Sequence, residues 1–186
     1  MNDKSFSKFL SLILRHKPET VGIKLDGNGW ADVAELLKGI NSSGRSINFA
    51  TLEKIVREND KQRFSFNEDK TKIRANQGHS VKVDVELEEK VPPKFLYHGT
   101  IERNANSIAI QGLIKGSRLY VHLSADVETA QKVAARRKGK PIIYKIFAQA
   151  MHDDGYKFYQ SKNGVWLTET VPPKYFCQLQ ASSFKL

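Results

Sequence analysis

The segment FLYHGT, residues 95–100, has a near-copy in LYVHLS at residues 119–124. Each segment is short, apolar and rich in residues typical of strands, and each carries one histidine, His98 or His122, followed closely by a hydroxyl residue. A stretch with helical character follows both. The pattern predicts two strand-to-helix corners whose imidazole and hydroxyl groups line one cleft. The alternative, that each histidine is a structural residue at a strand end, stays open.

Length and charge narrow the class of protein. The chain has 186 residues, which allows one large or two small domains. Its net charge is +10, from 30 Lys and Arg against 20 Asp and Glu, and such an excess favours a polyanionic partner or an anionic membrane surface over an acidic one. Cys177 is the single cysteine, so a disulfide framework is excluded, and we expect it to be buried. No signal peptide or long apolar run is present, so we expect a cytoplasmic protein.

The chain opens with apolar residues at helical spacing over residues 6–14, and Pro18 ends the predicted helix. Arg15 and His16 then fall in its last turn. Cations there cap the helix dipole, which is the structural interpretation. The functional interpretation is an anion site, because arginine offers a planar fork to phosphate oxygens and histidine a further donor.

Two more helices are predicted, over residues 33–40 and from a cap near Asn48 to residue 56. Alternating segments at 63–66 and 72–75 then form a predicted β-hairpin. Three helices followed by a hairpin is the element order of a winged helix, a fold that binds nucleic acid or protein.

An acidic segment closed by two prolines, residues 81–93, predicts a connection between two domains. Its valines also alternate, so part of it fits an edge strand. The preceding motif, Gln77–Ser80, ends the first domain, and His79 within it has no carboxylate or cysteine at metal-ligand spacing.

The second half predicts a helix over residues 104–111 that Gly112 closes, and another from a cap at Ser124 or Asp126 to about Arg137. The remaining predicted strands are 141–147, 158–159, 165–167 and 175–179. Many short strands with few helices indicate a mixed α+β fold. No G-x-G-x-x-G follows a strand, which excludes a Rossmann domain.

Several motifs in order carry a resemblance to a known family. They are Leu14–His16, Asp26–Trp30, Asn59–Phe64, Gln77–Ser80, Tyr97–Thr100, Val121–Ser124 and Gly164–Leu167. The last three resemble the NAD-binding core of the ADP-ribosyltransferase superfamily. Together the motifs resemble the RNA 2'-phosphotransferase family, which removes the splice-junction 2'-phosphate from tRNA. The resemblance runs from about Ser7 to Phe176.

The resemblance implies an N-terminal winged-helix lobe at residues 1–80, a connection at 81–93 and an ADP-ribosyltransferase-like lobe at 94–186. It also implies a reaction in two steps. The RNA 2'-phosphate attacks NAD, which is consumed, and releases nicotinamide; the ADP-ribose 2''-hydroxyl then attacks the linking phosphorus. The products are RNA with a 2'-hydroxyl and ADP-ribose 1'',2''-cyclic phosphate. No metal is implied, and a monomer is expected.

The resemblance assigns roles to individual residues. The implied catalytic residues are Arg15, His16, Arg63 and Arg136. The implied NAD-binding residues are His98, Gly99, Thr100, Gly112, His122, Ser124 and Val165. The implied RNA contacts are Lys17, Arg74, Arg137 and Lys138.

Two of these assignments need comment. Arg136 and Arg137 compete for the place of the family's catalytic arginine, because counting from Val133 and from Pro141 gives different answers; we place the catalytic arginine at Arg136.

Many ADP-ribosyltransferases carry a glutamate where this chain has Val165, and that glutamate serves protein acceptors. The departure favours a substrate-supplied nucleophile. The alternatives are an ADP-ribosyltransferase acting on nucleic-acid ends or protein, and a non-catalytic winged-helix RNA binder.

Overall fold

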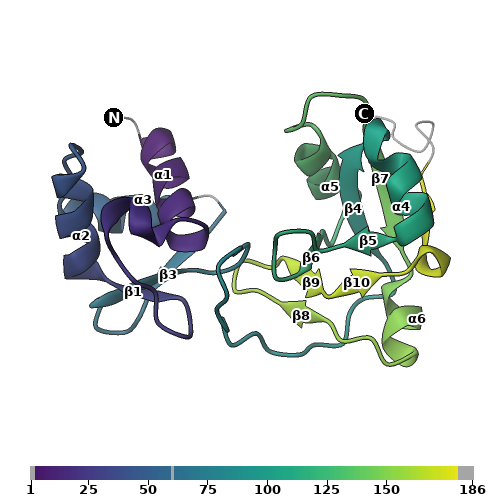
Figure 1. Cartoon of the computed structure of the whole chain (residues 1–186). Helices are drawn as coiled ribbons and strands as arrows, with labels where there is room; N and C mark the ends of the chain where they lie inside the picture. The colour runs from purple at the N-terminus through teal and green to yellow at the C-terminus, as the bar shows by residue number, and fades with distance from the viewer. Residues whose placement is uncertain (1–2, 60, 180–186) are drawn as a thin grey trace. The chain divides into compact units, whose positions relative to one another are not determined.

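The computed structural model describes residues 3–59 and 61–179 (Figure 1). The chain divides into two compact units, Met1–Leu87 and Glu88–Leu186, and this boundary lies inside the segment 81–93. The described residues form six α-helices and small antiparallel sheets, so the predicted α+β class is confirmed. The finer assignment to a winged-helix lobe and an ADP-ribosyltransferase-like lobe stays a prediction.

The first unit packs three helices on a three-stranded sheet of order β1-β3-β2. Its elements are α1 (Asp3–Arg15), η1 (Pro18–Val21), β1 (Trp30–Asp32), α2 (Val33–Ser42), α3 (Phe49–Arg57), β2 (Phe64–Phe66) and β3 (Lys72–Ala75). Side-chain caps fix two helix starts: Asp32 accepts from the Glu35 backbone N–H and Asn48 from that of Thr51, each at 2.9 Å. The three predicted helices and the hairpin are confirmed.

The second unit holds three small antiparallel sheets, of orders β11-β7-β4, β6-β9-β8 and β10-β5. Its strands are β4 (Leu96–Ile101), β5 (Leu113–Ile114), β6 (Val121–Leu123), β7 (Pro141–Ile146), β8 (Tyr159–Gln160), β9 (Trp166–Thr168), β10 (Thr170–Val171) and β11 (Phe176–Gln178). Its helices are η2 (Glu102–Asn104), α4 (Ala105–Gln111), α5 (Val127–Ala134), α6 (Ala148–Asp153) and η3 (Pro173–Tyr175).

Two helices cover opposite faces of the β11-β7-β4 sheet (Figure 1). On one face, α5 packs its alanines against Ile143 of β7. On the other, Ile108 of α4 joins a core with Ile142 and Ile146. Side chains of successive strand residues point to opposite faces, so this alternation divides β4 as well. The side chains of His98 and Thr100 therefore lie on the face away from α5.

Three expectations are corrected. The helix predicted to reach Arg137 ends at Ala134, because the N–H groups of Arg136 and Arg137 bond to carbonyls three residues back, Val133 O and Ala134 O, instead of four. No edge strand forms over 81–87, because Glu86 adopts φ +54°, which a strand excludes. Cys177 is exposed rather than buried. Its neighbour Phe176 packs on Tyr144 at 5.0 Å between ring centroids, which turns the thiol of the edge strand β11 to the other face.

Within the described parts of the chain, no helix is long and apolar enough to cross a membrane.

Candidate functional site

The two histidine segments that open the sequence analysis lie side by side in the second unit. Tyr97 and Ser124 exchange both backbone hydrogen bonds, Tyr97 N to Ser124 O at 2.9 Å and Ser124 N to Tyr97 O at 2.7 Å. The Nδ1 atom of His98 lies 3.0 Å from the backbone oxygen of His122. Segments more than twenty residues apart in sequence therefore form one corner that carries both imidazoles.

Backbone carbonyls determine which nitrogen of each ring carries hydrogen. A carbonyl oxygen can only accept, so His98 Nδ1 must donate to His122 O. His122 Nδ1 lies 3.0 Å from Tyr120 O and must donate in the same way. In a neutral ring the other nitrogen, Nε2, is then an acceptor. Such an acceptor is suited to a hydroxyl group of a ligand.

The environment keeps His98 neutral. Burial lowers the pKa of His98, the hydrogen bond to His122 O opposes this, and the charges of Arg137 and Arg118 lower the pKa further. The pKa of Arg118 is itself lowered, by desolvation and then by Arg137. Arg118 was not predicted. A single arginine in a turn has no periodic signal, and its position directly before the LYVHLS segment was the one available clue.

Three further residues predicted to bind NAD, Gly99, Thr100 and Gly112, also have structural roles. Gly99 and Gly112 have packing reasons for lacking a side chain: a Cβ on Gly99 would lie 1.9 Å from Ala130 O, and one on Gly112 2.2 Å from Val171 O. The hydroxyl of Thr100 is buried and accepts a hydrogen bond from Asn104 Nδ2 at 2.9 Å.

Ser124 and Val165 are half-buried near the same sheet. Ser124 follows β6 and Val165 precedes β9, and these two strands pair. Val165 N–H donates to the Ser161 hydroxyl at 3.2 Å. The chain therefore places both residues close to the strand that carries His122.

The predicted anion site of the first unit is built from the end of α1 and the Gln77–Ser80 segment. Arg15 is the last helical residue. His16, which was predicted to lie in the last turn, is the first residue after the helix. The Ser80 N–H donates to Arg15 O, and the Ser80 hydroxyl lies 2.9 Å from His16 Nδ1. A Cβ on Gly78 would lie 3.4 Å from Arg15 Nη1, so this segment runs along the guanidinium.

Arg63 lies directly before β2, in the same unit, with its backbone fixed from two sides. Its N–H donates to the Asn59 side chain at 3.3 Å, and its carbonyl accepts from Asn76 N at 2.8 Å. Asn76 also donates from its side chain to Gln62 O at 2.6 Å. These contacts set the position from which the Arg63 side chain leaves the chain.

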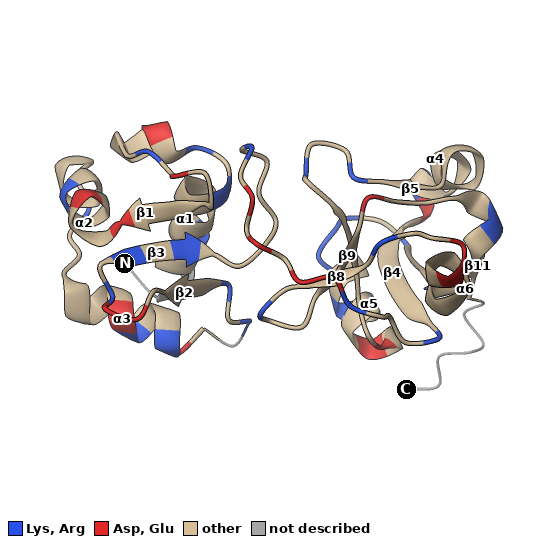
Figure 2. Cartoon of the chain, turned by 90° about the horizontal axis from the view of Figure 1, so that it is seen from below, with Lys and Arg blue, Asp and Glu red and all other residues tan. Residues whose placement is uncertain are grey.

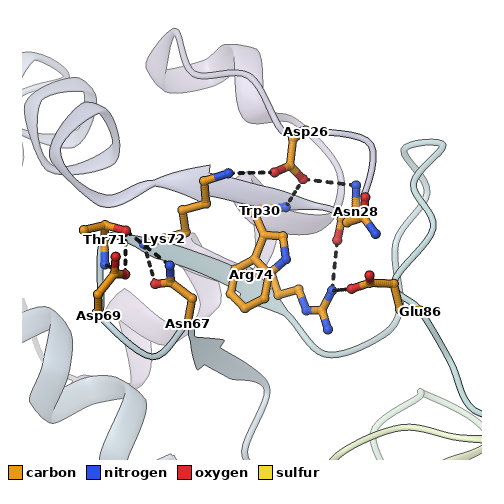
Figure 3. Close-up of polar contacts among 9 residues, drawn as sticks. All are labelled: Asp26, Asn28, Trp30, Asn67, Asp69, Thr71, Lys72, Arg74 and Glu86. Carbon is orange, nitrogen blue, oxygen red and sulfur yellow. Dashed lines mark hydrogen bonds and ion pairs between the residues drawn. The ribbon is translucent and has the colours of Figure 1, made fainter.

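Arg74 is placed differently from the other predicted RNA contacts (Figure 3). Its side chain is 8% exposed, its guanidinium carbon lies 4.4 Å from the Trp30 ring centroid, and its Nη1 lies 2.9 Å from a carboxylate oxygen of Glu86. It also donates to Asn28 O at 3.3 Å. A phosphate would have to displace Glu86 to reach this guanidinium.

The other predicted RNA contacts, and the predicted catalytic Arg136, are exposed. Lys17 follows His16, and Arg136, Arg137 and Lys138 lie in the turn after α5. Basic residues (blue) recur along both units, and β3 itself carries Lys72 and Arg74 (Figure 2). No group of three or more metal-ligating side chains occurs among residues 3–59 and 61–179.

Comparison with known proteins decides the family. The profile of the family described as "RNA 2'-phosphotransferase, Tpt1 / KptA family" matches residues 1–170. The chain belongs to this RNA 2'-phosphotransferase family. A protein of Fusobacterium nucleatum named "Probable RNA 2'-phosphotransferase" is 58% identical over 174 residues, which cover 94% of this chain and 97% of that protein. Proteins of the same name from Flavobacterium johnsoniae and Hahella chejuensis are 55% and 51% identical, covering 92% and 96% of this chain and 94% and 96% of the relatives.

The family match includes every predicted site residue of both units, because these all lie between Arg15 and Val165. It ends before β11, so exposed Cys177 lies outside the matched range. The resemblance to the RNA 2'-phosphotransferase family is thereby confirmed.

Proposed function

We propose that this protein removes a 2'-phosphate from RNA by transferring it to NAD. The observation that carries the proposal is the pairing of the two histidine segments, with His98 Nδ1 held 3.0 Å from His122 O. NAD supplies an electrophilic ribose carbon and nicotinamide as a leaving group, and it is consumed as a substrate. The family and the names of the relatives support RNA as the other substrate.

The donor set of the second unit fits NAD. His98 is held as a neutral ring whose Nε2 accepts, which suits a ribose hydroxyl. The charges of Arg118 and Arg137 act on His98, and guanidinium groups bind phosphate oxygens as planar forks. A dinucleotide offers both chemistries, ribose hydroxyls and a diphosphate.

The RNA 2'-phosphate is assigned to Arg15, His16 and Arg63 of the first unit. In the first step, a phosphate oxygen forms a bond to the ribose carbon and the bond to nicotinamide breaks. In the second, the ADP-ribose 2''-hydroxyl attacks phosphorus, its proton leaves, and the RNA 2'-oxygen departs and is protonated. Fixed arginines stabilise the phosphoryl charge. A histidine can move the proton.

The finer fold assignment belongs to the same proposal. The order α1, β1, α2, α3, β2, β3 with a three-stranded sheet supports a winged-helix lobe that binds RNA. The second unit is proposed as an ADP-ribosyltransferase-like lobe. Val165, in place of the glutamate of many such enzymes, fits a reaction whose nucleophile comes from the RNA substrate.

The test incubates the pure protein with NAD and an oligoribonucleotide carrying one internal 2'-phosphate, and follows nicotinamide and phosphate together. The control oligonucleotide has a 2'-hydroxyl at that position. We expect nicotinamide release and loss of the 2'-phosphate with the first substrate and neither with the control. A stable ADP-ribosylated acceptor would indicate an ADP-ribosyltransferase instead. No nicotinamide release would indicate a non-catalytic RNA binder.

A further inference from the structure

The motif Gln77–Ser80 has no role in the function proposed above, yet it holds the two residues that begin the phosphate site. Ser80 N–H donates to Arg15 O at 2.9 Å, and Val81 N–H reaches the same oxygen at 3.3 Å. The Ser80 hydroxyl lies 2.9 Å from His16 Nδ1, across 64 residues of sequence. The backbone of the motif thus fixes the end of α1, and one side chain contacts the imidazole.

A serine hydroxyl is an unusual choice of partner in this chain. His98 and His122 both direct Nδ1 at a backbone carbonyl, which can only accept. A hydroxyl can either donate or accept, and it changes role by rotating its hydrogen. When His16 is neutral, Ser80 can donate to Nδ1, which leaves the ring hydrogen on Nε2. When His16 is protonated, Nδ1–H donates to Ser80 and Nε2 still carries a hydrogen.

We propose that Ser80 is a positioning residue that lets His16 direct an Nε2–H donor at the RNA 2'-phosphate in both protonation states of the ring. A carbonyl in its place would leave Nε2 without hydrogen whenever the ring is neutral. A phosphate oxygen can only accept, so it needs the hydrogen on Nε2. This inference rests on the proposed function for the identity of the anion, but not for the state of the ring.

The charged and titratable groups around His16 fit an anion site. Arg15 and Lys17 flank it on its own segment, and His79 lies on the segment that faces it. His79 is 1% exposed, and neither of its ring nitrogens has a hydrogen-bond partner among the described protein residues. Burial, followed by the charges of Arg15, His16 and Arg74, lowers the pKa of His79 to about 4. The facing histidine is therefore neutral at neutral pH and leaves the anion to the arginine and His16.

The first arm of the test observes the ring directly by ¹⁵N NMR of histidine side chains. The chain has five histidines, and a His16→Asn variant assigns the signal of interest. We expect the neutral ring to carry its hydrogen on Nε2 in the parent protein and in Ser80→Thr. In Ser80→Ala the two neutral tautomers should mix. Ser80→Asp should raise the pKa of His16 by roughly 1 unit or more, because a carboxylate lies against Nδ1.

Ser11→Ala is the matched control, because it removes another serine hydroxyl that bonds within the first unit, to Ser7 O at 2.9 Å. It should leave the His16 signals unchanged. Unchanged His16 signals in both Ser80→Ala and Ser80→Asp would overturn the proposal. Should Ser80→Ala fail to fold, the pKa of His16 in Ser80→Asp decides alone.

The second arm measures turnover with the 2'-phosphorylated oligonucleotide and NAD. Ser80→Ala should lower kcat on the order of 10- to 100-fold without changing KM for NAD, and Ser80→Thr should restore kcat. An unchanged kcat in a folded Ser80→Ala would also overturn the proposal. Absence of activity in the parent protein would instead contradict the proposed function, while the NMR arm would still report on Ser80.

Discussion

The two units differ in the kind of group that contacts Nδ1 of a histidine ring. In the second unit His98 and His122 each place Nδ1 against a backbone carbonyl, of His122 and Tyr120. In the first unit His16 places Nδ1 against the hydroxyl of Ser80. A carbonyl fixes one tautomer, whereas a hydroxyl accommodates a ring that gains and loses a proton. The carbonyl partners therefore fix the pattern of donor and acceptor in the second unit, whereas in the first unit the hydroxyl partner does not.

The units also share a feature, since each holds one partly or fully buried histidine, His98 or His79, whose pKa nearby arginine charges lower. In the second unit burial, Arg137 and Arg118 lower the pKa of His98. In the first unit burial, Arg15, His16 and Arg74 lower that of His79. Each of these two rings is therefore neutral at neutral pH. In the proposed function, arginine rather than either of these histidines then supplies the positive charge for the anions.

The largest effect is expected from substituting one histidine of each unit, His16 or His98, and comparing turnover and binding in the two variants. His16→Ala should lower turnover by about 10²- to 10⁴-fold, because it removes a group proposed to move a proton, and should leave NAD binding unchanged. His98→Ala should weaken NAD binding and leave RNA affinity intact. Calorimetric titration of each variant with NAD, and of each with 2'-phosphorylated RNA, measures both.

Thermal unfolding of the two variants is the control. A His98→Ala protein that does not fold would return this histidine to a structural role. Loss of NAD binding in His16→Ala would contradict the proposal that the second unit binds NAD without His16.

The next effect concerns the arginines around His98. Removing a positive charge favours protonation, so Arg118→Ala and Arg137→Ala should each raise the pKa of His98, whereas Arg136→Ala should not. If Arg136 is the catalytic arginine, its loss should lower phosphate transfer on the order of 10²- to 10³-fold with NAD binding intact. NMR titration of His98 and single-turnover rates measure the two properties in the same three variants. A raised pKa in Arg136→Ala would contradict the assignment of charges.

Local patterns in the sequence predicted most of the first unit, for physical reasons. Helices α2 and α3 have apolar residues at helical spacing and side-chain caps, and both signals lie within a few neighbouring residues. The hairpin of β2 and β3 follows from alternation around a polar turn. Strand β1 was missed, because it forms by pairing with β3, with Trp30 opposite Arg74, and a contact so distant in sequence leaves no local signal.

The missed features of the second unit are short or depend on distant contacts. The pair β5 and β10 has two residues in each strand, and α6 has six, so neither gives a periodic signal. Arg118 becomes notable only because in the folded unit its charge lowers the pKa of His98. The same holds for Ser80, whose contact with His16 spans 64 residues. The sequence predicted that the two histidine segments come together, but not the partner of each ring.

A smaller effect follows from His79, the buried histidine of the first unit. Its pKa falls from 6.5 to about 4 on folding, so below pH 6.5 the unfolded chain binds a proton that the folded chain does not. The folded protein therefore keeps its full stability with respect to this group above pH 6.5, and loses stability as the pH falls from 6.5 toward 4. At about 1.36 kcal/mol per unit, the loss approaches about 3 kcal/mol in the free energy of unfolding.

Urea unfolding of the parent and of His79→Leu at pH 7.5 and pH 4 isolates this term, because other groups titrate equally in both proteins. The parent should lose more stability than the variant over this range. Equal losses would mean that His79 is protonated in the folded state, and the two units would then differ in this respect too.

The smallest effect tests whether both units contact RNA. Each lysine that neutralises a phosphate of a single strand contributes about 0.7 to the slope of log K against log salt. Lys17→Ala in the first unit and Lys138→Ala in the second should each reduce the slope of RNA binding by about that amount. Arg74→Gln should not, because Arg74 is buried, stacked on Trp30 and paired with Glu86. Fluorescence anisotropy of a labelled 2'-phosphorylated RNA across a salt series gives the slopes. A reduced slope in Lys17→Ala alone would confine RNA binding to the first unit, whereas a reduced slope in Arg74→Gln would mean that RNA displaces Glu86.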